Sequence, residues 1–268
     1  MLNGGLLVSA NKETFGKTLG FVLAVCLACA LLVSFAAVQL KPLQVENKLL
    51  DKQTKILEAA GILPEQATKK QIQDTFAKSV EAKMIDLDSG DFKEGNADLF
   101  DERRNARDVK LSDKPKNDIA GINRRSHDAV IYIVRDDAGK VETVVFPMVG
   151  SGLWDLMYAY VGVEGDLNTI RNVIYTAEMK ETPGLGAEVL NPKWIALWPG
   201  KKIFDDKSEV RVELVKGGVK PGNPNEMYQV DGLSGATLTA NGVTNTFKFW
   251  FGEEGYLPFI KKNQGGLK

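Results

Sequence analysis

The longest apolar run of the chain lies near its N-terminus. No charged residue occurs between Thr18 and Leu40, and Lys41-Pro42 ends the run. A helix of this length extends about 35 Å, which is enough to cross a bilayer core of about 30 Å with some tilt. A cleaved signal peptide is the alternative, although the run is longer than the apolar region of such peptides usually is. We predict a retained transmembrane helix over residues 18–40, preceded by a tail of residues 1–17.

Apolar residues recur at helical spacing in the segment that follows. A Gly-Ile-Leu-Pro sequence at residues 61–64 interrupts this pattern, which is typical of a break between helices. Residues 86–119 are rich in Asp, Lys and Asn and have the character of a loop with short elements. We therefore predict a helical stalk and loop region over residues 41–123. The spaced apolar residues are Leu49, Leu50, Ile56 and Leu57 before the break, and Ile72, Phe76 and Val80 after it.

From residue 124 onward the pattern changes to runs of β-branched residues. Residues 129–134 and 141–149 are two such runs joined by a short polar stretch, which predicts a β-hairpin. Strands and helices in mixed order favour an α+β fold, which we assign to a domain of residues 124–268. No Gly-x-Gly-x-x-Gly sequence opens a βαβ unit, so a dinucleotide-binding domain is not indicated. The other predicted elements are strands at residues 170–179, 210–215 and 227–230 and a helix at residues 241–251.

Composition narrows the classes of function. A chain of 268 residues with 44% hydrophobic content can bury one good core and carry appendages. Its net charge of -1 comes without a basic stripe, so we expect no nucleic-acid partner. Cys26 and Cys29 both lie in the apolar run, and two thiols cannot complete a four-ligand metal site. We predict neither a metal site nor a fold that depends on disulfides.

The chain contains one histidine, His127. Gly232-Leu233-Ser234-Gly235-Ala236 imitates the Gly-x-Ser-x-Gly turn of hydrolases. In that fold the catalytic histidine follows the serine along the chain, and none does here. We therefore name no catalytic residue.

A run of small and hydroxyl-bearing residues, Asp231 to Thr239, precedes the predicted C-terminal helix. Gly232 and Gly235 permit a tight turn and the close approach of another group to the backbone. A helix start is a natural seat for a phosphate. An ordinary helix-capping turn is the alternative on composition alone. The hydroxyls of the run belong to Ser234, Thr237 and Thr239.

The same run, Asp-x-x-Ser-Gly-Ala-Thr-x-Thr, resembles the flavinylation motif of membrane redox subunits. In that motif the threonine after Ser-Gly-Ala carries FMN through a phosphoester bond, which implies covalent FMN on Thr237. Two further sequences, Gly152-Leu153-Trp154 and Glu181 to Gly186, resemble parts of the FMN-binding domain of that family. With the single N-terminal span, the chain resembles the C subunit of the Na+-translocating NADH:quinone oxidoreductase. The motif also implies that Asp231, Ser234, Gly235, Ala236 and Thr239 belong to the cofactor site.

The resemblance implies an electron carrier that is not catalytic alone. It would pass electrons between NADH-derived donors and quinone while the complex pumps Na+. Its partners would be the other subunits of the complex, a flavin transferase for maturation, and the membrane. The resemblance places the protein in the bacterial inner membrane as a single-pass subunit with a periplasmic domain. The count of flanking lysines, Lys12 and Lys17 against Lys41, Lys48, Lys52 and Lys55, favours the opposite orientation.

The second motif supplies the remaining candidate residues of the cofactor site. Proline and two glycines would let the backbone approach a flat ligand, although an ordinary Pro-Gly turn is the alternative. Trp154 could stack on the flavin ring or pack under the sheet. Glu181 could contact the flavin or be a solvated loop residue, and Asp231 could be recognised by the transferase or cap the turn. The candidates in this loop are Glu181, Thr182, Gly184, Leu185 and Gly186.

Two other functions stay open at this point. One is the homologous FMN subunit of an ion-translocating ferredoxin–NAD electron-transport complex, which shares the Ser-Gly-Ala-Thr motif. The aromatic C-terminal sequence from Phe247 to Phe259 is more similar to that of the sodium pump. The other is a membrane-anchored binding module without a redox role, which a flavin that stays attached through denaturation would exclude.

Overall fold

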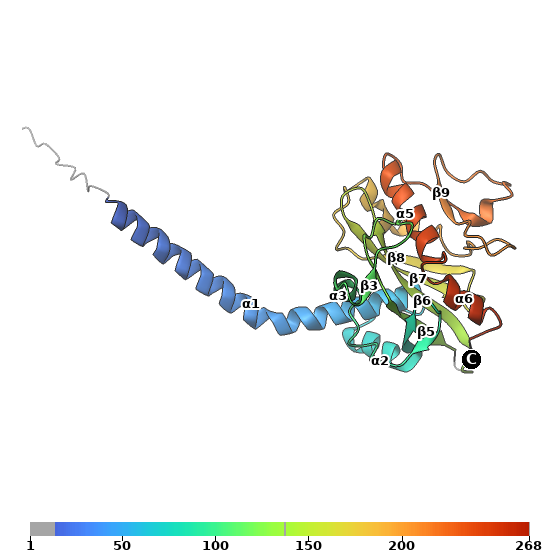
Figure 1. Cartoon of the computed structure of the whole chain (residues 1–268), viewed down its shortest axis with the longest axis horizontal. Coiled ribbons are helices and arrows are strands. Elements are labelled where there is room, and N and C mark those ends of the chain that lie inside the picture. Colours follow the sequence, from blue (N-terminus) through green and yellow to red (C-terminus); the bar gives the residue numbers. More distant parts are fainter. Residues whose placement is uncertain (1–13, 137, 268) are drawn as a thin grey trace, which may run out of the picture. The chain divides into compact units, whose positions relative to one another are not determined.

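The computed structural model describes residues 14–136 and 138–267. Residues 1–13, most of the predicted tail, therefore lie outside the described part of the chain. The chain divides into two compact units, one up to Leu49 and one from Leu50 onward. Figure 1 shows the elements along the chain, and each unit is described by itself below.

The first unit contains most of helix α1 (Phe15–Ala59), which covers the whole predicted span. Within the described residues, α1 is the one helix long and apolar enough to cross a membrane, with a mean hydropathy of 2.8 in its most apolar stretch. The apolar run ends at Lys41-Pro42, but the helix continues through Pro42. A proline removes one backbone hydrogen-bond donor from a helix, but the residues before and after Pro42 remain helical.

The second unit is built on a six-stranded sheet with the order β2-β1-β5-β6-β7-β8. All neighbouring strands pair antiparallel. The predicted hairpin is confirmed, and the apolar stretch after Trp154 adds a strand, β7, to it. The strands are β1 (Val80–Asp86), β2 (Phe92–Lys93), β5 (Asp128–Arg135), β6 (Val141–Ser151), β7 (Leu156–Glu164) and β8 (Ile170–Tyr175).

The sheet crosses the domain boundary predicted at residue 124. Strand β1 pairs with β5 along its whole length, from Val80 opposite Val134 to Asp86 opposite Asp128. The intervals of four from Ile72 through Phe76 to Val80 predict a helical face that includes Val80, and for Val80 this prediction is wrong. An interval of four fits a strand as well as a helix, since both faces repeat at that spacing. The stalk and loop region thus contributes an interior strand of the sheet.

Several elements begin or end at other residues than predicted. Helix α5 begins at Thr237 rather than at residue 241, so it includes the end of the hydroxyl-rich run. The strand predicted at 227–230 is a short 3-10 helix, η2, followed by β10, and β8 ends at Tyr175 instead of residue 179. The strand predicted at 210–215 is β9, which is shorter. The remaining elements are α2 (Lys69–Ser79), α3 (Glu102–Arg107), β3 (Ser112–Asp113), β4 (Arg125–Ser126), η1 (Gly186–Leu190), α4 (Pro192–Ile195), β9 (Glu213–Val215), η2 (Glu226–Tyr228), β10 (Gln229–Asp231), α5 (Thr237–Trp250) and α6 (Leu257–Asn263).

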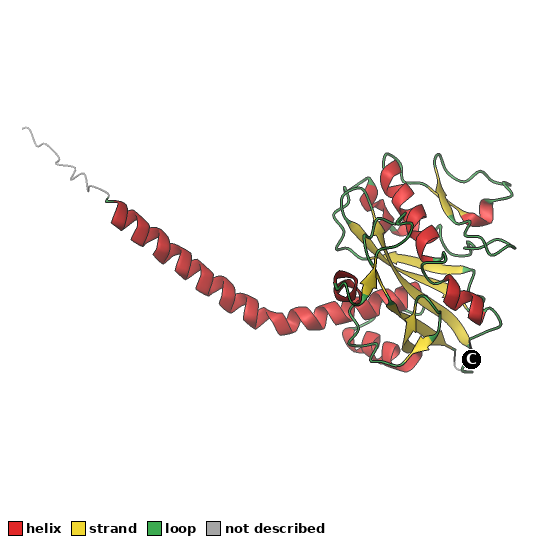
Figure 2. Ribbon diagram, viewed as in Figure 1, coloured by secondary structure: helices red, strands yellow, loops and turns green. Residues whose placement is uncertain are grey.

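Helices cover both faces of the sheet, as Figure 2 shows, which confirms the α+β class. One face carries α5 and the larger core, with Phe146, Trp198 and Phe247 almost fully buried. The other face carries a smaller core that includes Ile56 and Ala59, at the end of α1 in the second unit. Burial of these side chains is the main stabilising contribution to the unit.

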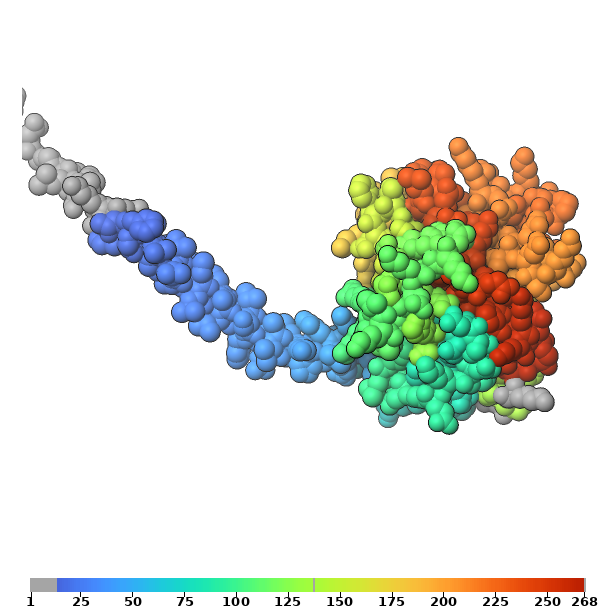
Figure 3. All heavy atoms as spheres, in the orientation of Figure 1, coloured from blue at the N-terminus to red at the C-terminus, as the bar shows by residue number. Residues whose placement is uncertain are grey.

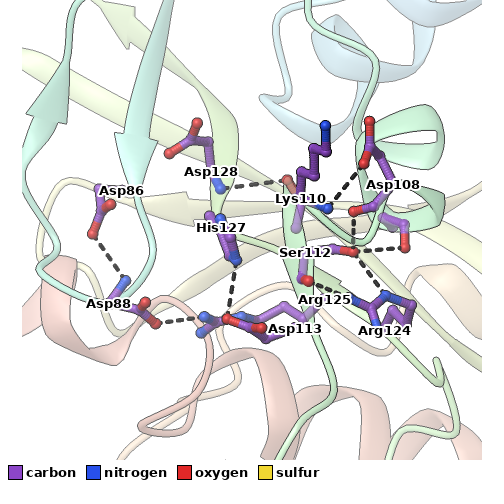
Figure 4. Close-up of polar contacts among 12 residues, drawn as sticks. Asp86, Asp88, Asp108, Lys110, Ser112, Asp113, Arg124, Arg125, His127 and Asp128 are labelled. Carbon is purple, nitrogen blue, oxygen red and sulfur yellow. Dashed lines mark hydrogen bonds and ion pairs between the residues drawn. The ribbon is translucent and has the colours of Figure 1, made fainter.

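The segment between β2 and β5 contains a cluster of polar contacts, several of which Figure 4 draws. The buried Ser112 hydroxyl donates to the Asp108 carbonyl at 2.7 Å and accepts from Arg124 Nε at 2.9 Å. Arg125 is also buried, and its guanidinium donates to the Glu254 carbonyl at 2.7 Å. These bonds satisfy buried polar groups that would otherwise be costly, and they tie the segment to the loop between α5 and α6.

Candidate cofactor site

Three segments that are distant in sequence meet around the side chain of Glu181. They are the turn after β6, the loop after β8, and the first turn of α5. Glu181 Oε1 accepts a hydrogen bond from the Trp154 backbone N at 2.9 Å. Glu181 Oε2 accepts one from Thr239 Oγ1 at 2.6 Å. Glu181 is only 5% exposed, so it is neither a solvated loop residue nor freely available to a ligand.

Two glycines of the predicted motifs pack directly against this carboxylate. A Cβ on Gly152 would collide with Glu181 Oε1, and one on Gly186 would collide with Glu181 Oε2 and lie 2.8 Å from Thr239 Oγ1. The sequence predicts an open Gly186 side for a flat ligand, but the protein's own side chains take up that space. Gly184 differs, because its φ of +75° requires glycine and nothing lies within 4 Å of its missing Cβ.

The first turn of α5 lacks the caps that several other helices of the chain carry. Its N-cap residue is Ala236, which makes no side-chain cap, and its first turn contains no acidic residue. By contrast, α2 begins with a capping box at Thr68. The first backbone N–H groups of a helix have no partner within it, and they carry partial positive charge. The first turn of α5 thus offers backbone donors for an anion, as helix N-termini commonly do.

The exposed threonine at this helix start is Thr237, the first residue of α5. Ser234 is exposed as well, whereas Thr239 is 1% exposed and bonded to Glu181. Gly235 has a φ of +73°, and its missing Cβ would lie 2.8 Å from Leu185 Cδ2. This contact places the Pro-Gly loop beside the turn that leads into α5.

Large apolar side chains lie exposed on the same three segments. Trp154 is 69% exposed and Leu238 is 61% exposed. Trp154 does not pack under the sheet, and its indole N–H donates to Thr182 Oγ1 at 3.2 Å. Exposed apolar groups gathered in one place mark a binding surface. We call this surface the apolar rim, and it consists of Leu153, Trp154, Leu185 and Leu238.

Helix α5 and the end of β6 also pack closely together one turn further along the helix. A Cβ on Gly242 of α5 would collide with the Ser151 carbonyl and lie 3.5 Å from Gly152 Cα. The orange-red start of α5 and the yellow-green chain that follows β6 can be followed on the surface in Figure 3. The close approach of α5 to the end of β6 is what brings the turn and the helix start together.

Asp231 makes its hydrogen bonds to residues other than those that contact Glu181. Its carboxylate accepts from the Val219 backbone N at 2.7 Å, and its carbonyl accepts from Trp194 Nε1 at 2.9 Å. Asp231 therefore fixes the loop beside β9 and β10 instead of capping α5. No local sequence signal marks these two contacts or the exposed Leu238, because all depend on packing of distant segments.

The hydrolase alternative finds no support in the geometry. His127 Nε2 lies 3.0 Å from Asp113 Oδ2. In the described part of the chain, none of the hydrogen bonds of His127 involves Ser234. The remaining contacts of His127 are backbone bonds to Leu87 and Leu111.

Comparison with known proteins defines the class of this site. The family model of the FMN-binding domain matches residues 152–252, which include all three segments around Glu181. The domain is thus an FMN-binding domain, and its uncapped helix start and apolar rim suit a ligand with a phosphate and an aromatic ring.

Relatives that match over nearly the whole chain define the family. The C subunit of the Na(+)-translocating NADH-quinone reductase of Yersinia pestis is 45% identical over 96% of this chain and 97% of its own length. The same subunit of Vibrio alginolyticus is 44% identical over 97% and 99%. The chain belongs to the family of the C subunits of Na+-translocating NADH-quinone reductases, as its sequence motifs predicted.

Solved structures agree with this assignment. The crystal structure of Shewanella oneidensis NqrC superposes with a TM-score of 0.74 at 43% identity and covers 81% of this chain and 96% of that chain. The C subunit of the Na(+)-translocating NADH-quinone reductase from Parabacteroides distasonis superposes with a TM-score of 0.64 at 27% identity and covers 82% and 96%.

Proposed function

We propose that this chain is the electron-carrying FMN subunit of a Na+-translocating NADH:quinone oxidoreductase, with FMN bound covalently to Thr237. The observation that carries the proposal is the exposed Thr237 hydroxyl at the uncapped start of α5, next to the apolar rim. A phosphate needs the first of these features and a flavin ring needs the second. The family membership supports the redox role.

The attachment is a group transfer that a flavin transferase would carry out with FAD. Thr237 Oγ1 forms a bond to the phosphorus on the riboflavin side of the pyrophosphate. The bond from that phosphorus to the bridging oxygen breaks, AMP leaves with the bridging oxygen, and the hydroxyl proton is released. The backbone N–H groups at the start of α5 would then be available to donate to the phosphoester oxygens. A covalent bond also prevents loss of the cofactor to a compartment without free FMN.

The residues around Thr237 fit the rest of the cofactor. FMN supplies one-electron and two-electron transfer when it is bound. Trp154 and Leu185 offer apolar surface for the ring, and Gly184 exposes backbone that could donate to it. Thr182 positions the Trp154 indole through its hydroxyl. Asp231 holds the neighbouring loop through the Val219 backbone and does not cap the helix start.

The other steps of the reaction belong to other subunits. Residues 18–40 contain no ionisable group apart from two cysteines, so α1 offers no path for Na+. No nucleotide-binding fingerprint is present for NADH. We propose that the chain spans the bacterial inner membrane once through α1, that its second unit lies in the periplasm, and that electrons pass through its FMN on the way to quinone.

The decisive test is the fate of flavin in variants of Thr237. Wild-type protein co-expressed with a flavin transferase should fluoresce on a denaturing gel and gain the mass of one FMN. Thr237→Ala should lose both signals, whereas Ser234→Ala, the neighbouring hydroxyl, should keep them. Thr237→Ser keeps the hydroxyl and tests how strictly the transferase reads the methyl group. Covalent flavin on the Thr237→Ala protein would overturn the proposal.

The orientation can be tested separately. Protease added to intact spheroplasts should digest the second unit if it lies in the periplasm. Full protection of that unit would place it in the cytoplasm, in line with the count of flanking lysines, and would overturn this part of the proposal.

A further inference from the structure

The Glu181 carboxylate is buried and is held by hydrogen-bond donors. Glu181 is 5% exposed and Thr239 1%. Among the described residues, none of the ion pairs includes Glu181. A buried carboxylate without hydrogen-bond donors would be strongly unfavourable. Glu181 has two such donors, Trp154 N and Thr239 Oγ1, and these bonds hold the carboxylate in one place.

Each of those bonds reaches a part of the site that surrounds Thr237. Thr239 lies two residues after Thr237, in the same first turn of α5. Trp154 carries the exposed indole of the apolar rim. Glu181 itself begins the loop that ends at Gly186, and Gly186 packs against Glu181 and Thr239. One carboxylate therefore sets the distance between the helix start and the rim.

A second threonine of α5 shows what the Thr239 hydroxyl would ordinarily do. Thr246 is 3% exposed, and its Oγ1 donates to the Gly242 carbonyl of its own helix at 2.7 Å. This is the usual bond of a helical threonine. Thr239 instead bonds to a residue 58 positions earlier in the chain. Its hydroxyl joins the helix to the loop, whereas that of Thr246 stays within the helix.

We propose that Glu181 is a positioning residue, which through Thr239 and the Trp154 backbone fixes the acceptor Thr237 relative to the apolar rim. The inference rests on the proposed attachment of FMN to Thr237. Its consequence is twofold. The apoprotein presents the Thr237 hydroxyl to the transferase in one geometry, and the attached flavin is held against the rim in one orientation.

The experiment compares Thr239→Val with the matched control Thr246→Val. Both substitutions replace a buried hydroxyl of α5 by a methyl group of similar size. The measurements are the thermal midpoint of the full chain, the rate of covalent loading by a flavin transferase with FAD and Mg2+, and the fluorescence anisotropy of the attached flavin. Thr239→Val should slow loading roughly tenfold, the scale expected from loss of one buried hydrogen bond to a charged group, and should lower the anisotropy. Thr246→Val should leave both near wild type.

Thr239→Ser keeps the hydroxyl and should restore loading and anisotropy. If Thr239→Val does not fold, Thr239→Ser decides, because a tenfold slower loading in that variant would assign the effect to packing and overturn the inference. Equal loading and anisotropy in Thr239→Val and Thr246→Val would also overturn it. Covalent flavin on Thr237→Ala would instead overturn the proposed attachment, so the two failures are distinguishable.

Discussion

The two ends of α5 are stabilised in opposite ways. At the C-terminal end, Phe247 and Trp250 are each 1% exposed, and Trp250 Nε1 donates to the Val149 carbonyl at 2.7 Å. Tyr256, which follows the helix, is fully buried and donates to the Pro147 carbonyl at 2.5 Å. At the N-terminal end, Thr237 is exposed and Leu238 is 61% exposed.

The difference shows how one helix can serve both the core and a binding surface. Aromatic burial anchors the C-terminal end, since each large side chain removes much apolar area from water. The N-terminal end buries the small side chains of Ala236 and Ala240, and the hydrogen bond from Thr239 to Glu181 and glycine contacts hold it in place. This arrangement leaves the surface around Thr237 free for a ligand. Functional sites commonly give up local stabilisation in this way.

The largest effect should follow from truncation of the aromatic end. Trp250→Ala leaves a cavity and an unpaired Val149 carbonyl, so it should lower the free energy of unfolding by about 3–5 kcal/mol. Urea unfolding followed by circular dichroism measures the loss. Leu238→Ala at the opposite end is the control and should change the free energy by less than about 0.5 kcal/mol. Equal losses in the two variants would contradict the comparison.

A smaller effect should follow from crowding of the contact between the loop and Glu181. Gly186→Val would place its side chain against Glu181 and Thr239, at an expected cost of about 1–3 kcal/mol. Because the added side chain pushes on the Glu181–Thr239 contact that positions Thr237, covalent loading should slow, and the midpoint potential and absorption spectrum of the flavin should shift. Gly200→Ala is the control, since it strains a positive φ without a collision and lies outside the three segments around Glu181. A Gly186→Val protein with wild-type spectra and potential would mean that the loop does not position the flavin.

Glu102, the first residue of α3, allows a test of whether the pH dependence of stability arises outside α5. Loss of hydration raises the pKa of Glu102 to about 7, against the attraction of Arg103 and Lys52. The folded carboxyl then holds its proton more firmly than the unfolded one, with its ordinary pKa of 4.5. Stability should therefore fall as the pH rises from about 4.5 to about 7. The thermal midpoint of wild type should fall between pH 5 and pH 8, and Glu102→Gln should flatten this change.

A pH slope that is unchanged in Glu102→Gln would assign the dependence to other groups. The attached flavin offers an internal control, because its anisotropy should not differ between wild type and Glu102→Gln at either pH.

The smallest effect on stability should come from the apolar rim. Trp154 is largely exposed, so Trp154→Ala should change the free energy of unfolding by less than about 0.5 kcal/mol. The flavin should nevertheless respond, with higher fluorescence and lower anisotropy, because an aromatic neighbour is lost. Trp154→Phe should retain part of the wild-type signal. A flavin signal that is unchanged in Trp154→Ala would remove Trp154 from the site.

Local sequence patterns predicted most of the elements and the family, but not the contacts between the residues of the site. The uncharged run of residues 18–40 lies within α1, and the two β-branched runs form the β5–β6 hairpin. The Ser-Gly-Ala-Thr motif marked the start of α5 to within a few residues. Such features depend on neighbours along the chain, so their signal is present in the sequence.

The roles of individual residues depended on the tertiary structure. Glu181 meets Trp154 and Thr239, which are 27 and 58 positions away, only because the antiparallel sheet and α5 bring their segments together. The same tertiary contacts pack Gly186 against Glu181 and Thr239, whereas Trp154 stays outside the core. The sequence by itself determined the membrane-type helix and the class of fold, because both are set by local periodicity or composition, and its Ser-Gly-Ala-Thr run carried the resemblance to the family. Only the tertiary structure decided which carboxylate holds the site together, because contacts between distant segments are set by strand register and helix packing.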